Sequence, residues 1–158
     1  MTEPYATTHD YLDDYFALLA LRLHREVALV RLLRGESSTK YAFLGLFLSD
    51  EEMDSLLAGL HGVALPGGDE DELLEAKIEL MTAAVEERLA ATPTDRLRPR
   101  QLAALLGLSP PDIELLLLLL ATEVDHRFSR VYAYLQDDVS RRWLSPGLAL
   151  RLLPGAGP

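Results

Sequence analysis

The chain has 158 residues, 49% of them apolar, with no cysteine and a formal net charge of −10. The missing cysteine excludes a disulfide framework, a thiolate metal site and a cysteine nucleophile, and the apolar share argues against disorder. This length allows one domain or two small helical subdomains, and the acidic balance disfavours nucleic-acid binding over the whole surface because it repels phosphates.

The first predicted element is a long amphipathic helix from about Thr8 to Arg34. Apolar residues recur three or four positions apart between Leu12 and Val30, with charged residues between them. Gly35 is a natural residue to follow its end. The next segment, residues 35–48, mixes aromatic residues with glycine and fits a buried connection or a short strand equally well.

A second predicted helix begins after Ser49, because Ser49 and Glu52 have the spacing of a capping box. The Gly-rich and acidic run at 61–72 is the best linker candidate. It leads into a third helix, from about Asp69 to Ala90. The apolar stripe expected to face inward on that helix comprises Leu73, Leu74, Ile78, Met81 and Val85.

The charge changes where the third helix ends, near residue 91. Residues 1–91 carry 18 acidic residues against 7 Lys and Arg, whereas residues 92–158 carry 7 against 8. We therefore expect an acidic helical subdomain at 1–91 and a second subdomain at 92–153. The Pro- and Gly-containing residues 154–158 fit the start of a linker.

The second half begins with a helix-turn-helix pattern. A short helix from Pro99 to Leu106 is followed by Gly107 as the turn residue and by Ser109 as N-cap of the next helix, with Pro110 at its first position. A DNA-reading second helix needs polar side chains for base edges, but six leucines occupy residues 115–120. We expect that helix to be the central core helix, covered by protein.

Two further helices complete the prediction, one from Asp125 to Gln136 and one starting at Ser145. The second half also holds a cluster of basic residues that could form an interaction patch. Its candidate residues are Arg98, Arg100, Arg127, Arg130, Arg141 and Arg142. The alternative, which we favour, is that these arginines pair with nearby acids such as Asp125 and Asp138.

Catalytic and metal-binding patterns are missing from the sequence. No Gly-Lys pair occurs, so the phosphate-binding loop of ATPases is absent. His9, His24, His61 and His126 are scattered without metal-ligand spacing. Asp137 and Asp138 are adjacent and point in different directions, so one of them is expected to cap a turn. We expect no enzyme activity in this chain and no cofactor.

The last third of the chain resembles the winged-helix-like domain on the N-terminal side of certain bacterial AAA-type ATPases. The matching residues are Gly107–Pro110, the leucine run, Glu123, Asp125, Arg127, Arg130, Tyr132–Asp138, Arg141, Arg142 and Gly147–Leu150. The resemblance implies an all-α multi-helix bundle with a helix-turn-helix or winged-helix-like C-terminal half, with or without a short β wing. Some of these ATPases are encoded with contractile injection systems.

The resemblance also implies a function. We expect a non-catalytic domain that recognises a partner or arranges subunits, while an ATPase module of the same full-length protein uses ATP. Its partners would be that module and a protein substrate or adaptor. Nucleic acid is disfavoured, no membrane is expected, and a homo-oligomer stays open. The alternative is a winged-helix DNA-binding regulator of transcription. No secretion signal is visible after Met1, so a cytoplasmic location is expected.

Overall fold

The computed structural model describes residues 2–34, 49–60 and 70–153, which form seven α-helices, one short 3-10 helix and no strand. The prediction of an all-helical fold is confirmed, and no β wing occurs in these residues. The helices are α1 (Thr8–Arg34), α2 (Asp50–Gly59), α3 (Glu70–Ala91), the 3-10 helix η3 (Thr94–Arg96), α4 (Arg98–Leu106), α5 (Pro110–Val124), α6 (His126–Leu135) and α7 (Pro146–Leu152).

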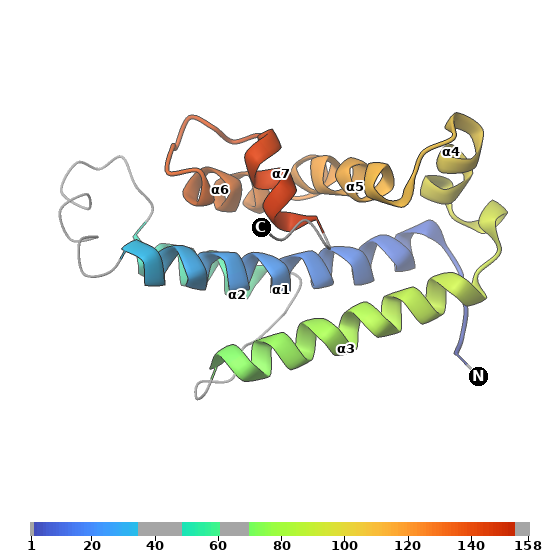
Figure 1. Ribbon diagram of the computed structural model, residues 1–158, viewed down its shortest axis with the longest axis horizontal. Coiled ribbons are helices and arrows are strands. Elements are labelled where there is room, and N and C mark those ends of the chain that lie inside the picture. The colour runs from blue at the N-terminus through green and yellow to red at the C-terminus, as the bar shows by residue number, and fades with distance from the viewer. Residues whose placement is uncertain (1, 35–48, 61–69, 154–158) are drawn as a thin grey trace.

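The helices are arranged in layers around α1, which runs through the middle of the molecule (Figure 1). Helix α3 lies along one side of α1 and contacts it over much of its length. Helices α5, α6 and α7 lie on the other side, where α6 contacts both α1 and α2. Helix α4 projects at one end of the row, before α5.

Helix α1 is the central helix of the fold. Between Leu18 and Leu23 every side chain is buried, so this stretch is covered on all sides. Two charged residues of α1, Arg22 and Glu26, are buried as well. An amphipathic helix packed on one side exposes its polar face, and α1 departs from that pattern because helices cover it from both layers.

The prediction that the leucine-rich helix is the central one is wrong. In α5, Leu117, Leu118 and Ala121 are buried, but Leu115 is 37% exposed and Leu119 is 46% exposed. Helix α5 belongs to an outer layer, and a helix in such a position buries only the stripe that faces the core. Six leucines in a row fill that stripe and also part of the opposite side.

The helix starts were predicted correctly. Ser49 and Glu52 form the expected capping box. Ser109 precedes α5, where its backbone N and its Oγ both donate to Asp112 Oδ2, at 2.8 and 2.6 Å. Ser145 Oγ accepts from Leu148 N at the start of α7. These caps satisfy first-turn N–H groups that no helical carbonyl can reach.

The turn between α4 and α5 is the expected one. Gly107 adopts φ +66°, in the left-handed region, and Leu108 N donates to Ala103 O at 3.0 Å across the end of α4. This is a common way for a helix to end, because only glycine enters that region without steric cost. The predicted helix-turn-helix is therefore present.

The stripe predicted for α3 is correct for Leu74, Ile78 and Val85, which are buried against α1, and wrong for Leu73, which is half exposed. Buried residues from both predicted subdomains belong to a single hydrophobic cluster. The expectations for residues 35–48, 61–69 and 154–158 lie outside the described residues. No helix in the described ranges is long and apolar enough to cross a membrane.

Candidate functional site

A line of partly buried polar contacts joins α1 to the C-terminal helices. Tyr15 Oη donates to Glu114 Oε2 of α5, and an Arg22 terminal nitrogen lies 3.4 Å from Glu114 Oε1. Four residues further along α1, Glu26 accepts from Arg151 of α7. These charges are paired across the layer boundary, so the buried side chains of Arg22 and Glu26 each have a partner of opposite charge.

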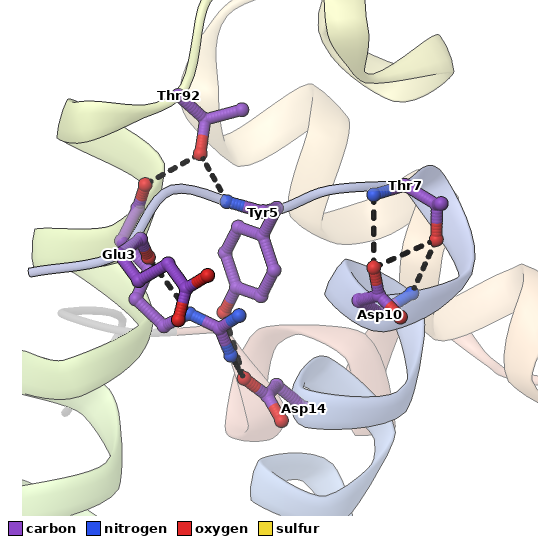
Figure 2. Close-up of polar contacts among 7 residues, drawn as sticks. Glu3, Tyr5, Thr7, Asp10, Asp14 and Thr92 are labelled. Atoms are coloured by element: carbon purple, nitrogen blue, oxygen red, sulfur yellow. Dashed lines mark hydrogen bonds and ion pairs between the residues drawn. The ribbon is translucent and has the colours of Figure 1, made fainter.

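The N-terminal segment is hydrogen-bonded to the end of α3 (Figure 2). Tyr5 is fully buried, its backbone N donates to Thr92 Oγ1 at 2.9 Å, and its hydroxyl donates to Asp14 Oδ2 at 3.1 Å. Arg88 donates to the same Asp14 oxygen, and its guanidinium carbon lies 4.0 Å from the centre of the Tyr5 ring. This cluster combines an ion pair with a cation–π contact.

The same close-up shows how α1 begins. Thr7 donates from its backbone N and from Oγ1 to Asp10 Oδ2, both at 2.9 Å, while Asp10 N donates to Thr7 Oγ1 at 3.2 Å (Figure 2). This reciprocal arrangement caps the helix. The N-terminal segment and α1 are therefore held in one orientation relative to the end of α3.

These polar clusters have the chemistry of structural clamps. Burial raises the pKa of Tyr11 to about 12, and burial together with the Glu114 carboxylate raises the pKa of Tyr15 well above its ordinary value. Both phenols therefore stay protonated at neutral pH, and that of Tyr15 donates a hydrogen bond from α1 to α5. A general base, by contrast, needs a pKa near the working pH.

Of the four histidines, His61 lies outside the described residues, His9 and His24 lie fifteen positions apart on α1, and His126 begins α6. His24 is half buried in α1, and its Nε2 atom has no hydrogen-bond partner among the described residues. His9 lies on the exposed side of α1, 3.5 Å from Asp13. Within the described ranges no group of three His, Asp or Glu side chains could hold a metal ion.

The six arginines of the predicted patch lie at two ends of the molecule. Arg98 and Arg100 belong to α4, at one end of the helix row, whereas Arg127 and Arg130 belong to α6 at the other (Figure 1). Arg141 and Arg142 lie in the connection between α6 and α7. Whether any of them binds a partner stays a prediction.

Several of these arginines have structural partners. Arg100 donates to the carbonyls of Leu89 and Thr92, both at 2.7 Å, and so caps the end of α3. Arg127 donates to both carboxylate oxygens of Asp125, which lowers the pKa of that carboxyl, and to the Gly59 carbonyl.

The other arginines of the predicted patch make fewer contacts. Arg141 lies 3.4 Å from Asp138, whose carboxylate also accepts from Ser140, so the predicted turn cap at residues 137–138 is present. The side chains of Arg98 and Arg130 make no ion pair with another residue in the described part of the chain.

The feature that sequence reasoning missed is a set of exposed leucines on the two helices of the helix-turn-helix, here called the leucine face. It comprises Leu102, Leu105 and Leu106 of α4 with Leu115 and Leu119 of α5, and Leu105 is 80% exposed. Helix α4 buries only Pro99 and Ala103, and its three leucines stay exposed. Exposed apolar residues are a feature of interaction sites where they form a continuous patch.

Comparison with known proteins gives one family. A family model described as "Winged helix domain, variant" matches residues 1–156, nearly the whole chain. No curated protein matches, and no solved structure matches.

Proposed function

Because the chain belongs to the variant winged-helix domain family, we propose that it is a protein-interaction module, the non-catalytic N-terminal part of an AAA-type ATPase. In this role it recognises a substrate or adaptor protein, or arranges subunits, in the bacterial cytoplasm. The ATPase module of the same full-length protein is its other partner. The resemblance at residues 107–150 supports the ATPases that are encoded with contractile injection systems as the parent family.

The observation that carries the proposal is the leucine face. In a DNA-reading helix-turn-helix the exposed side of the second helix presents polar groups to base edges. In α5 that side carries Leu115 and Leu119 between Asp112 and Glu123, all exposed. Leucines offer no hydrogen bonds to bases, and the two carboxylates would repel phosphates.

The surface suits a protein partner instead. Burial of apolar side chains is the main favourable contribution to most protein–protein association. The leucines of α4 and α5 are already exposed on rigid helices, so docking costs little further ordering. The overall charge of −10 adds to the case against DNA.

The test uses this chain against the ATPase module of its parent protein, with binding measured by interferometry. The double variant Leu105→Glu/Leu119→Glu removes the leucine face, and we expect it to weaken binding about tenfold or more. The matched control is Leu150→Glu, since Leu150 is an exposed leucine on α7, and it should bind as the unaltered chain does. Equal binding by all three proteins contradicts the proposal.

A second measurement addresses the alternative of a DNA-binding regulator. Labelled duplexes are titrated with the chain and followed by fluorescence anisotropy at two salt concentrations. We expect a flat titration. Binding that weakens steeply with salt would establish the DNA-binding function in place of the proposed one.

A further inference from the structure

Helix α4 is held on the molecule by few apolar contacts. Among its nine residues only Pro99 and Ala103 are buried, and Leu105 is 80% exposed. Its main packing neighbours are η3 and α5, the elements next to it in the chain. Elements with few buried apolar contacts open locally at low free energy. Polar contacts with the rest of the molecule therefore decide how firmly α4 is held.

The first turn of α4 is capped by a residue from the other end of the chain. Leu97, at the N-cap position, makes no side-chain hydrogen bond to the helix. The Arg98 N–H donates instead to Thr8 Oγ1 at 3.0 Å, across 90 positions of sequence. Thr8 is the first residue of α1. Its hydroxyl therefore takes the part of an N-cap side chain, because it satisfies a first-turn donor that no helical carbonyl reaches.

A second contact joins α4 to the end of α3 at Thr92, which is only 3% exposed. Arg100 donates from α4 to the Thr92 carbonyl at 2.7 Å. The hydroxyl of the same threonine accepts from Tyr5 N at 2.9 Å, as Figure 2 shows, and donates to the Arg88 carbonyl at 2.6 Å. Thr92 thus binds the N-terminal segment through its side chain and α4 through its backbone.

The N-terminal segment, residues 2–7, is itself anchored in the core. The Tyr5 side chain is fully buried, and the centre of its ring lies 5.4 Å from that of the Tyr11 ring, in an edge-on contact. Thr8, which caps α4, follows this segment directly. The contacts that hold the segment therefore also hold the Thr8 hydroxyl beside Arg98.

We propose that residues 2–8 form a strap that sets the position of α4, and that α4 detaches only when this strap is displaced. The short helix η3 and Gly107 border α4 at its two ends, so these connections take up the movement. The inference deepens the proposed function and rests on it, because three of the five leucines of the leucine face lie on α4. The strap holds those leucines in place before a partner docks, which lowers the cost of ordering them.

The test follows amide hydrogen exchange of the purified chain by NMR, which measures how easily each part opens. We expect lower protection factors for the α4 amides than for the buried residues of α6. The Tyr5 amide should share the protection factor of α4, because one opening exposes the strap and α4 together. An α4 as strongly protected as α6, or a Tyr5 amide far better protected than α4, contradicts the inference.

Thr92→Val tests the coupling between the strap and α4. The variant removes the hydroxyl that binds Tyr5 and keeps the carbonyl that binds Arg100. We expect it to lower the protection of the α4 amides about fivefold, as the loss of one hydrogen bond does, although it removes no contact of α4. Unchanged protection would show that α4 opens without the strap, and would overturn the inference.

The capping role of Thr8 is tested by a pair of variants. Thr8→Val removes the hydroxyl that accepts from Arg98, and it should lower the protection of α4 about fivefold. Thr8→Ser keeps a hydroxyl at the same position, so it should retain the protection of the unaltered chain. A serine variant as poorly protected as the valine variant would contradict the capping role.

Arg151→Met is the matched control for a general loss of stability. It should lower protection in α6, whose amides exchange through global unfolding. It should leave α4 unchanged, because opening of α4 does not break the contact between Arg151 and Glu26. An equal loss in both helices would show that α4 opens only with the whole fold, and would contradict the inference.

Failure here is distinguishable from failure of the proposed function. The exchange experiment contains neither the ATPase module nor DNA, so it tests the strap alone. If the leucine-face variant binds the module as the unaltered chain does, the protein-interaction function is lost while the exchange results stand.

Discussion

Arg151 donates from two nitrogens, at 3.1 and 2.7 Å, to a single carboxylate oxygen of Glu26. The two residues lie 125 positions apart, on the last and first helices. The Glu26 side chain is only 7% exposed, and its other oxygen lies 3.8 Å from Arg25. This contact ties α7 to the central helix.

Replacing Arg151 with methionine should therefore destabilise the fold. The change leaves a buried carboxylate with one distant cation, and we expect the free energy of unfolding to fall by about 1–3 kcal/mol, measured by urea denaturation. The double variant Glu26→Gln/Arg151→Met should recover part of that loss. The control is Arg141→Met at the exposed pair with Asp138, for which we expect a change below about 0.5 kcal/mol. Equal losses would contradict the prediction.

The leucines of α5 should differ sharply in their contribution to stability. Leu117 is 1% exposed and packs in the core, whereas Leu119 is about half exposed on the leucine face. Leu117→Ala should cost about 2–5 kcal/mol, because it removes buried methyl groups and leaves a cavity. Leu119→Ala should cost less than about 1 kcal/mol. Comparable midpoints of urea denaturation for the two variants would show that both leucines are covered.

The difference between the buried and exposed leucines of α5 shows how far the sequence could predict the fold. Local signals worked well: the periodicity from Thr8 to Arg34, the Ser49–Glu52 box and Gly107 each depend on residues near in sequence. The covered side of α5 could not be predicted, because six leucines in a row contain no polar residue that marks the outside.

The central position of α1 was hidden for the opposite reason. Arg22 and Glu26 look like residues of an exposed polar face, but they are buried against Glu114 and Arg151. Those partners lie about a hundred positions away, so no local pattern reveals the pairing. The candidate interaction surface was missed similarly, since exposure of Leu105 depends on what the tertiary fold leaves uncovered.

Two glycines offer a test of backbone conformation. A Cβ atom would meet no atom within 4 Å at either Gly107 or Gly147, so only the backbone distinguishes them. Gly107→Ala should destabilise by about 1 kcal/mol, because φ is +66° there. Gly147→Ala, in the first turn of α7, should be neutral or stabilise by up to about 1 kcal/mol. The melting temperatures of both variants test these opposite effects on stability. A lower melting temperature for Gly147→Ala would contradict the prediction.

His24 should make the stability depend on pH in the weakly acidic range. Burial lowers the pKa of His24, and a hydrogen bond to the Leu57 backbone and the charge of Asp54 oppose that effect only in part. The cations Arg31 and Lys77, on α1 and α3, lower it further. The folded protein therefore holds this imidazole neutral at a pH where the unfolded chain protonates it.

The sign of the pH dependence follows from that difference. Below the unfolded pKa of about 6.5 the unfolded chain binds a proton that the folded chain does not, so stability is complete above that pH and falls as the pH drops towards the folded pKa. Urea denaturation at a series of pH values should show this slope in the wild-type chain and a smaller slope in His24→Gln. His9→Gln, which removes a mostly exposed imidazole, is the matched control. If His24→Gln keeps the full wild-type slope, another group causes the pH dependence.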